Sequence, residues 1–287
     1  MKTIDIHTHG AFGINFDTAT SEDINNYAKQ AYEKGIIAFC PTLTGNTSEY
    51  LAQRLEVIKR AKSNQKKDEA KIIGANLEGT FLSKSKPGVQ NPDVFFEPSI
   101  ENFKKIAKNN EDIIKIVVIA PENNNCADFI KYLKSKDIKV HFGHTEANFL
   151  DGADCINHLY NGMTPMTHKK ETLAIKALLD KSIYTELIGD GVHIVDDVLK
   201  LTFKMRPLDK ILLISDSLPI AGSNLEYVEF CGKKVFNNGL DEKGTLGGSV
   251  KLLPQIAQGL INRGLINEAE AYKMAYQNQI DYFKLIV

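Results

Sequence analysis

Eight short apolar runs, rich in β-branched residues, recur along this 287-residue chain and restrict its fold more than any other feature. They lie at residues 3–7, 36–42, 72–77, 114–119, 140–143, 155–159, 183–188 and 211–215. Segments with the helical spacing of apolar residues separate most of the runs, at residues 22–34, 48–62, 100–109, 126–135, 173–180 and 195–204. This alternation of strand and helix indicates an α/β fold with a parallel sheet buried on both faces.

Eight strand–helix units are the number that closes a (β/α)₈ TIM barrel, so a barrel is the predicted fold. The rival is an open, doubly wound sheet. A dinucleotide-binding sheet of that kind carries G-x-G-x-x-G after its first strand, whereas this chain has HTHGAFG there. The sequence contains no linker rich in Pro, Gly or Ser and no internal repeat. We therefore expect a single domain over residues 1–287.

The region after the eighth strand adds a smaller feature to the barrel. The stretch YVEFCGKKVF, with Gly-Lys at its centre, predicts a hairpin insertion at about residues 226–237. The motif GTLGGS then opens a predicted helix at residues 250–262, and a last helix at about 268–285 ends the chain.

Charge and cysteine usage exclude several classes of function. The formal net charge of −1 offers no electrostatic argument for nucleic acid or for a membrane surface. No stretch approaches the roughly 20 apolar residues of a membrane span, and the N-terminus lacks the regions of a signal peptide. The four cysteines are scattered, without a C-x-x-C pair, so we expect reduced thiols in a cytoplasmic protein.

Histidines and carboxylates follow the predicted strands at six of their carboxyl ends. In a TIM barrel these ends surround one shared mouth, where the chemistry takes place. Each residue alone would be an ordinary loop residue or helix cap, but six strand ends in agreement favour a metal site. The residues concerned are His7 and His9 of DIHTH, Glu78, His144, His158, His193 and Asp216.

The histidines of DIHTH are two positions apart, so in a strand their side chains point to the same side. The two remaining histidines have ordinary interpretations: His141 lies within a strand and belongs to the barrel wall, and His168 lies in a polar loop.

The chemistry of the predicted site follows from its ligands. A nitrogen and oxygen ligand set without thiolate suits zinc, iron, manganese or cobalt, and we take zinc, as one or two ions, as the working expectation. Such an ion lowers the pKa of a bound water to about 7. Asp216 could take a proton from that water and pass it to a leaving group, so the predicted reaction class is metal-assisted hydrolysis.

Seven motifs in order resemble the amidohydrolase superfamily, and within it the N-acetylglucosamine-6-phosphate deacetylases, over nearly the whole chain. They are DIHTHG, NLEGTFLSKSKPGVQNP, GHTEA, NHLYNGMTP, GDGVH, ISDSLPIAG and GTLGGS. The resemblance implies that Glu78, His144 and His158 bind the principal metal ion, while His7 and His9 can hold a second. It makes Asp216 the general base and acid, and it implies substrate contacts from Gln90, Asn161, Gly162, Lys169, His193, Leu246 and Gly247.

The implied substrate is an amino sugar phosphate, and the implied reaction is attack of water on the acetamide carbonyl of N-acetylglucosamine 6-phosphate, releasing acetate. His193 would orient or polarise the substrate. Neither nucleic acid nor a membrane is an expected partner. The superfamily's small β-sandwich would come from residues before DIHTHG and after the last helix, and it is not expected within this chain. The apolar surface that such a domain would cover suggests a homo-oligomer, most simply a dimer.

Three positions depart from the family pattern. Thr80 replaces a Pro, Gln90 replaces a His, and Lys169 replaces an Arg, with Lys170 beside it. Because Arg grips phosphate with two parallel hydrogen bonds and Lys offers a point charge, the Lys169 exchange bears on the preference for a 6-phosphate.

Two alternatives stay open at this point. The same scaffold could act on another N-acyl sugar, an N-acyl amino acid or a cyclic amide, because fold and metal do not determine specificity. A barrel that binds a sugar or a metal without turnover is the other alternative, and the presence of Asp216 argues against it.

Overall fold

A computed structural model describes residues 1–123 and 126–286 of the chain, and it has the predicted barrel. The barrel strands are parallel and follow one another around the sheet in chain order. They are β1 (Thr3–Thr8), β4 (Ile36–Leu43), β6 (Ala75–Phe81), β7 (Ile114–Ile119), β8 (Lys139–Phe142), β9 (Cys155–Ile156), β10 (Tyr184–Ile188) and β11 (Ile211–Ile214). All eight predicted strand positions are therefore occupied by strands.

The strands divide their side chains between two apolar layers. In β7, Ile116 and Val118 point into the barrel, whereas Val117 and Ile119 pack outward against the helices. This alternation explains why the runs look continuously apolar in the sequence, since both faces of each strand are buried.

Two kinds of contact close the barrel between β1 and β11. Thr8 and Ser217 form an isolated parallel bridge, and the backbone N–H of His9 donates to the Ser217 carbonyl at 2.9 Å. Deeper in the seam, the buried Asp5 carboxylate accepts hydrogen bonds from the Ser215 backbone N–H at 3.2 Å and from its hydroxyl at 2.5 Å. The side chain of Asp5 thus adds to the backbone hydrogen bonds that join β1 to the segment after β11.

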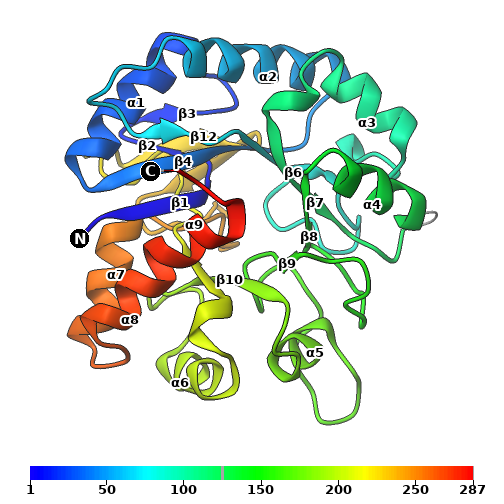
Figure 1. Cartoon of the computed structure of the whole chain (residues 1–287), viewed down its shortest axis with the longest axis vertical. Coiled ribbons are helices and arrows are strands. Elements are labelled where there is room, and N and C mark those ends of the chain that lie inside the picture. Colours follow the sequence, from blue (N-terminus) through cyan, green and yellow to red (C-terminus); the bar gives the residue numbers. More distant parts are fainter. Residues whose placement is uncertain (124–125, 287) are drawn as a thin grey trace.

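A ring of helices surrounds the strands, as the view along the barrel in Figure 1 shows. Side-chain caps begin several of them; for example, Thr20 and Asp23 form a capping box at α1. The ring comprises α1 (Ser21–Glu33), α2 (Ser48–Ser63), α3 (Ile100–Ala107), α4 (Cys126–Ser135), α5 (Leu173–Leu179), α6 (Asp196–Met205), α7 (Leu253–Asn262) and α8 (Glu268–Tyr272).

The C-terminal helix α9 (Asn278–Phe283) closes one end of the barrel. In Figure 1 it crosses the middle of the ring. Its Tyr282 packs with Ile4, Ile6 and the other side chains that fill the barrel interior. Because the active end of such a barrel lies at the carboxyl ends of the strands, α9 forms the floor of the interior and leaves the mouth open.

Shorter elements complete the fold. The predicted hairpin is present as β12 (Tyr227–Phe230) and β13 (Lys233–Phe236), and β2 (Gly10–Ala11) pairs with β3 (Ile14–Asn15) after the first barrel strand. Single turns of 3₁₀ helix occur at η1 (Pro92–Val94), η2 (Glu111–Ile113) and η3 (Leu208–Lys210).

Several predicted boundaries were wrong. The third strand was expected at 72–77, but it is divided into β5 (Lys71–Ile72) and β6, which runs on to Phe81. The sixth was expected at 155–159 and ends at Ile156, where the chain turns towards the barrel mouth.

Two helices also differ from their predicted ranges. The helix expected at 250–262 begins only at Leu253, and the one expected at 268–285 is interrupted by a π-helical turn, η4 (Lys273–Gln277). Apolar runs in the sequence indicate which residues are buried, and residues stay buried where a helix is interrupted. The runs therefore do not show where a helix begins or changes its hydrogen-bonding pattern.

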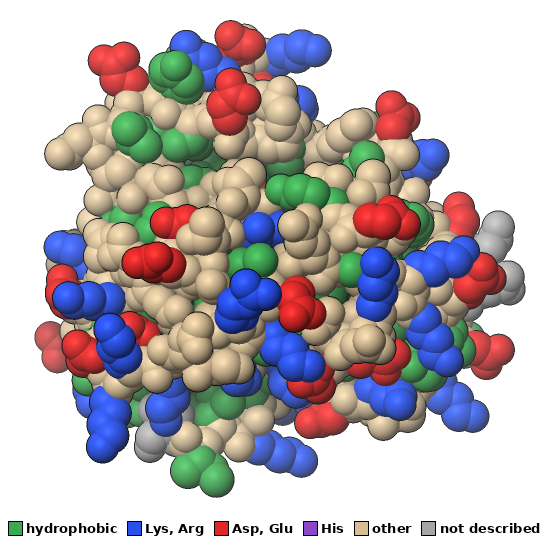
Figure 2. Space-filling model, turned by 90° about the horizontal axis from the view of Figure 1, so that it is seen from above, with side chains coloured by type: hydrophobic (Ala, Val, Ile, Leu, Met, Phe, Trp, Pro, Cys, Tyr) green, Lys and Arg blue, Asp and Glu red, His purple; other side chains and the backbone are tan. Residues whose placement is uncertain are grey.

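The outer surface carries charges of both signs. Figure 2 looks onto the α1 and α2 side of the molecule, where basic and acidic side chains are interspersed and no histidine is visible. Among the described residues, no helix combines the length and apolar character that crossing a membrane requires.

Candidate metal centre

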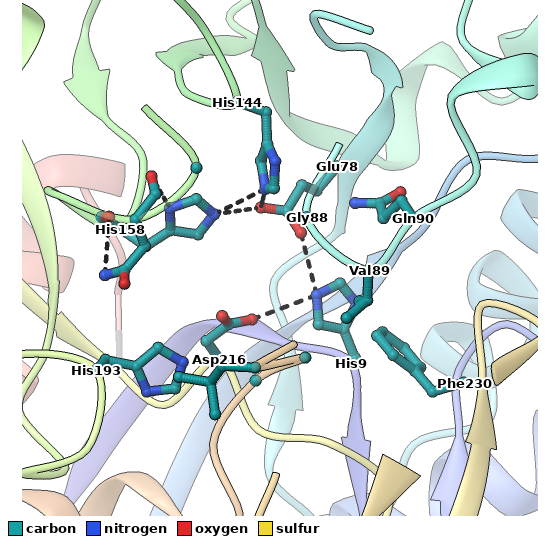
Figure 3. Close-up of a pocket in the computed structure, with 15 residues that line it drawn as sticks. His9, Glu78, Gly88, Val89, Gln90, His144, His158, His193, Asp216 and Phe230 are labelled. Atoms are coloured by element: carbon teal, nitrogen blue, oxygen red, sulfur yellow. Dashed lines mark hydrogen bonds and ion pairs between the residues drawn. The ribbon is translucent and has the colours of Figure 1, made fainter. Parts of the chain in front are cut away.

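Five side chains, each from a different strand or the residues just after it, converge at the mouth of the barrel (Figure 3). They are His9, Glu78, His144, His158 and Asp216. Glu78 lies within β6, and the others stand just beyond the ends of β1, β8, β9 and β11. They line one pocket, whose walls comprise His9, Glu78, Gly88, Val89, Gln90, His144, His158, Asn161, Gly162, His193, Asp216, Phe230, Leu246, Gly247 and Gly248. His7, fully buried at the end of β1, lies directly against this cluster.

Glu78 stands at the centre of a first group of donor atoms. Its Oε1 lies 2.9 Å from His158 Nε2 and 3.4 Å from His144 Nε2. The two imidazole nitrogens are 3.1 Å apart. Three potential ligand atoms from three strands therefore face one another.

The other oxygen of Glu78 belongs to a second group. Glu78 Oε2 lies 3.1 Å from His9 Nε2 and 3.4 Å from His7 Nε2. Asp216 Oδ1 completes the group at 3.3 Å from His9 Nε2 and 3.4 Å from His7 Nε2. Glu78 is thus shared by both groups, one carboxylate oxygen facing each.

These distances suit a divalent ion. Within each group the donor atoms lie within 4.8 Å of one another. Four ligands at 2.0–2.1 Å in tetrahedral geometry stand roughly 3.3 Å apart. Among the described residues, His7 Nε2 and Asp216 Oδ1 are buried without a hydrogen-bond partner, which is costly unless another group meets them. The residues present therefore form a group able to hold a metal ion.

Neighbouring groups orient the imidazoles. His144 Nδ1 lies 2.7 Å from the Lys86 carbonyl, and His158 Nδ1 lies 3.2 Å from the Asn161 carbonyl. In each ring the Nδ1–H can donate to a carbonyl and leave Nε2 as the atom that faces Glu78, which is the arrangement typical of metal-binding histidine.

Backbone conformation also sets the positions of two of these side chains. His144 and Asp216 have φ values of 48° and 50°, in the left-handed region that residues other than glycine rarely adopt. Such strain persists only where the surrounding structure imposes it, and it is concentrated at functional sites.

The cluster attracts positive charge. Burial disfavours the imidazolium form of His9, yet the nearby carboxylates of Asp216 and Glu78 raise its pKa to about 9. Burial likewise opposes ionisation of Glu78, but the surrounding histidines, His7 first, hold the pKa of Glu78 well below its usual range. Two buried carboxylates among imidazoles favour a bound cation for the same electrostatic reason.

The residues that the family resemblance assigns to substrate occupy different places. Gln90 lines the pocket, and its Oε1 accepts a hydrogen bond from the Gly45 backbone N–H at 3.0 Å. His193 lines it as well, with Nδ1 2.8 Å from Asp190 Oδ2. Other members of the set that line the pocket are Asn161, Gly162, Leu246 and Gly247.

Lys169 is separated from these residues. It is exposed in the loop before α5 and is not among the residues that line the pocket. Its role in binding a phosphate stays a prediction that this placement does not favour. Lys170 is exposed beside it, and His168 lies in the same exposed loop, as its polar surroundings in the sequence predict.

The sequence analysis missed two residues that contact the candidate ligands. Phe230, from the hairpin, packs edge-on against His9 with ring centroids 5.0 Å apart, and no motif pointed to it. Glu186 in β10 contacts His7, with 3.0 Å between Glu186 Oε2 and His7 Nδ1. A single carboxylate inside the apolar run of residues 183–188 was a usable signal, since Glu is rarely buried without a partner.

The fold and this cluster together define the class of the protein: an amidohydrolase-type barrel with a group of side chains able to hold a metal ion. No protein-family model matches the chain. A solved structure of N-acetylglucosamine-6-phosphate deacetylase from Pasteurella multocida superposes with a TM-score of 0.89 at 25% identity, covering 99% of this chain and 76% of that one.

Curated relatives identify the family. The N-acetylglucosamine-6-phosphate deacetylase of Haemophilus influenzae is 30% identical over 288 residues, covering 95% of this chain and 73% of the relative. The enzyme of the same name from Bacillus subtilis is 32% identical over 260 residues, covering 86% of this chain and 65% of the relative. An N-acetylgalactosamine-6-phosphate deacetylase of Escherichia coli O157:H7 is 27% identical, covering 95% of this chain and 74% of the relative. The chain belongs to the N-acetylglucosamine-6-phosphate deacetylase family.

Proposed function

We propose that this protein is a metal-dependent hydrolase that converts N-acetylglucosamine 6-phosphate to glucosamine 6-phosphate and acetate. The observation that carries the proposal is the convergence of Glu78, His144 and His158 on one point, with Asp216 on the wall of the same pocket. Family membership supports the substrate class. Because this chain spans only part of the length of its relatives, activity is assigned to it as a proposal.

The metal component of the proposal rests on the two groups that share Glu78. Glu78, His144 and His158 would hold the principal ion, and His7, His9 and Asp216 surround the place of a second. We propose zinc, with iron, manganese or cobalt as alternatives that the same ligands accept. A divalent ion held by these residues would polarise the acetamide carbonyl and lower the pKa of a water molecule to about 7.

Asp216 is the group that we assign to proton transfer. The pKa of Asp216 is lowered, because the nearby His7 and His9 outweigh the effect of burial, so the carboxylate is ionised and able to accept a proton. In the proposed reaction the oxygen of water bonds to the acetamide carbon, and Asp216 takes the proton that this oxygen loses. Asp216 then delivers a proton to the nitrogen as the carbon–nitrogen bond breaks, which yields acetate and the free amine.

His193 is proposed to orient the substrate. Its contact with Asp190 holds the ring so that Nδ1 is engaged and Nε2 is left for the pocket that the ring lines. A donor or acceptor held in this way orients a sugar hydroxyl or the acetamide without loss of side-chain freedom on binding.

The composition of the pocket restricts how a 6-phosphate would be bound. The residues that line the pocket include neither Lys nor Arg. A phosphate would therefore meet backbone N–H groups, the side chains of Gln90 and Asn161, or a charge from outside the described pocket. Lys169, in its exposed loop, is the cation that the family resemblance assigns to this task.

A second candidate substrate is the galactosamine isomer. It is favoured by a specific observation, the similarity to a deacetylase of N-acetylgalactosamine 6-phosphate at 27% identity. The two sugars differ in the configuration of one hydroxyl, so hydrogen-bonding groups at the pocket rim decide between them.

The proposal is tested by acetate release from a panel of N-acetylated sugars, after metal analysis of the protein. The panel contains N-acetylglucosamine, N-acetylgalactosamine and N-acetylmannosamine, each with and without a 6-phosphate, together with an N-acetyl amino acid and a cyclic amide. We expect the highest kcat/KM with N-acetylglucosamine 6-phosphate. Hydrolysis confined to the amino acid or the cyclic amide would contradict the sugar assignment.

A Lys169→Ala variant run on the same panel tests the phosphate contact. We expect a higher KM for the phosphorylated sugar only, with the same metal content as the parent protein. An unchanged KM would remove Lys169 from the phosphate site.

Location and assembly form part of the same proposal. We propose a cytoplasmic homodimer. The four cysteines are all unpaired in the structure, which suits a reducing compartment. Light scattering on the purified protein tests the dimer, and a mass of 32.0 kDa in solution, that of one chain, would contradict it.

A further inference from the structure

Beneath the two groups of ligands lies a fully buried carboxylate that the proposed mechanism does not use. Glu186 Oε2 lies 3.0 Å from His7 Nδ1 and accepts a hydrogen bond from the backbone N–H of His158 at 3.1 Å. His7 belongs to one group and His158 to the other. A single oxygen atom of Glu186 therefore contacts both.

The contacts continue from Glu186 to the floor of the barrel. Glu186 Oε1 lies 3.0 Å from His141 Nδ1, an ion-pair distance without the in-line geometry of a hydrogen bond. His141 Nε2 in turn lies 3.0 Å from the hydroxyl of Tyr282 on α9. Glu186, His141 and His7 are 0% exposed and Tyr282 is 6% exposed, so water does not compete for these contacts.

The donor and acceptor atoms of these four side chains can be assigned in one consistent direction along the series. Burial raises the pKa of Tyr282 well above its usual value, so its hydroxyl keeps its proton and can donate to His141 Nε2. If His141 accepts this hydrogen bond at Nε2, its own hydrogen lies on Nδ1, the atom nearest Glu186 Oε1, and Glu186 Oε2 is left to accept from His7 Nδ1. When an ion takes the place of the second proton of His7, the hydrogen on Nδ1 leaves the Nε2 lone pair for that ion, and Nε2 is the atom that faces Glu78 and Asp216.

We propose that Glu186, His141 and Tyr282 are positioning residues that hold His7 with its Nε2 lone pair directed at the metal centre and link that centre to the C-terminal helix. The inference rests on the proposed function in one respect, since it requires that His7 bind an ion. It goes beyond that function by making the barrel floor part of the metal site. Partners that fix a ligand's tautomer typically change metal affinity by 10–100-fold when they are removed.

A purely structural role makes a different prediction. If the contacts among these buried polar side chains only joined α9 to the strands, their loss would lower the melting temperature and leave metal affinity unchanged. Metal affinity and the geometry of the bound ion are therefore the informative readouts, and neither requires substrate.

The experiment compares Glu186→Gln and Tyr282→Phe with the parent protein. Gln has one acceptor oxygen in place of two, so one of the two histidines faces an N–H₂ group. Phe keeps the ring of Tyr282 and removes only the hydroxyl.

Matched controls are Glu69→Gln, a buried carboxylate that accepts hydrogen bonds from Asn25 and Lys66, and Tyr132→Phe, whose hydroxyl contacts Glu111 on the outside of the barrel. Zn²⁺ affinity is measured by competition with a chelating dye, and the Co²⁺-loaded proteins are compared by visible absorption.

We expect a 10–100-fold higher Kd for Zn²⁺ in Glu186→Gln, a smaller increase in Tyr282→Phe, and an altered Co²⁺ spectrum in both. The controls should match the parent in both measurements. A Kd within twofold of the parent in Glu186→Gln and Tyr282→Phe would overturn the inference, whatever their melting temperatures.

Should Glu186→Gln fail to fold, Tyr282→Phe alone decides the question. Because acetate release is assayed separately, a parent protein that binds Zn²⁺ but lacks deacetylase activity would contradict the proposed function and leave this test valid.

Discussion

At the scale of single residues, the site depends on buried polar atoms whose partners are few and specific. Asp216 faces two imidazoles with one oxygen, and its backbone N–H and carbonyl bond to His7 and Ser249 on either side. Its position is therefore set by the barrel seam as well as by its own side chain. A substitution of the same shape should change the chemistry of the site and preserve its geometry.

Asp216→Asn is expected to lower kcat by about 10²–10⁴-fold, because an amide cannot accept the proton that the carboxylate takes. The Glu78, His144 and His158 group does not include Asp216, so one equivalent of metal should remain. Steady-state kinetics and elemental analysis on the same preparation check both statements. Turnover near the parental rate would exclude Asp216 as the general base.

Asp190→Asn tests how His193 is held, and its effect depends on pH. Hydrogen bonds from His193 and from the backbone N–H groups of Val192 and His193 outweigh burial and lower the pKa of Asp190 to about 2. Since this folded-state pKa lies below the ordinary value of 3.8, the stabilisation is present above pH 4 and declines as the pH falls towards 2.

The variant should therefore lose about 2 kcal/mol of unfolding free energy at pH 6 and about half of that at pH 3. Urea unfolding of both proteins at the two pH values measures the difference. A loss that is equal at both would show that Asp190 contributes by packing alone.

At the scale of elements, the loops after the strands carry the site, and their backbone conformation places the ligands. Gly162, after β9, has φ of 59°, and a Cβ there would lie 3.0 Å from His144 Nδ1 and 3.1 Å from its Cε1. A side chain at position 162 would therefore crowd the imidazole of His144, which would have to move to make room for it.

Gly162→Ala is expected to weaken metal binding by displacing His144, in addition to the backbone cost of about 1–2 kcal/mol for a left-handed alanine. Gly264→Ala is the matched control, because its φ is 66° and nothing lies within 4 Å of the added methyl group. Both variants should show a similar loss in unfolding free energy, and only Gly162→Ala should show a higher Kd for Zn²⁺. Equal metal affinity in the two variants would exclude the contact with His144.

At the scale of the whole molecule, the candidate metal centre lies at the mouth of the barrel, where five strands contribute side chains, so a bound ion should stabilise the entire barrel. The donor atoms of the two groups come from β1, β6, β8, β9 and β11 or the residues just after them, and Glu78 belongs to both groups. A ligand that binds only the folded state adds about 4 kcal/mol when its free concentration is 1,000 times its Kd.

Removal of the ion with a chelator should therefore lower the melting temperature by several degrees, and added Zn²⁺ should restore it. Calorimetry of the parent protein with and without chelator measures the effect. The same treatment of a Glu78→Gln variant should produce little change, because Glu78 belongs to both groups. An unchanged melting temperature of the parent protein in the presence of the chelator would contradict a structural contribution from the metal.

The sequence by itself determined the order of strands and helices. It also determined which strand ends are followed by the candidate site residues. Residues such as His144 and His158 could be placed because parallel strands bring their carboxyl ends to one edge, so chain position alone predicts that these side chains meet. Local patterns were weaker at boundaries, as β6 and the interrupted C-terminal helix show, since burial does not stop where a hydrogen-bonding pattern changes.

Only the tertiary structure decided how Glu78 divides its two oxygens between two groups of ligands, that Glu186 supports His7 from below, and that Tyr282 reaches this network from the far end of the chain. It also placed Phe230 in the pocket and Lys169 outside its lining. These relations join residues far apart in the sequence, and their side-chain directions depend on packing across the barrel. No periodicity along a single strand encodes which atoms of distant strands come into contact with one another.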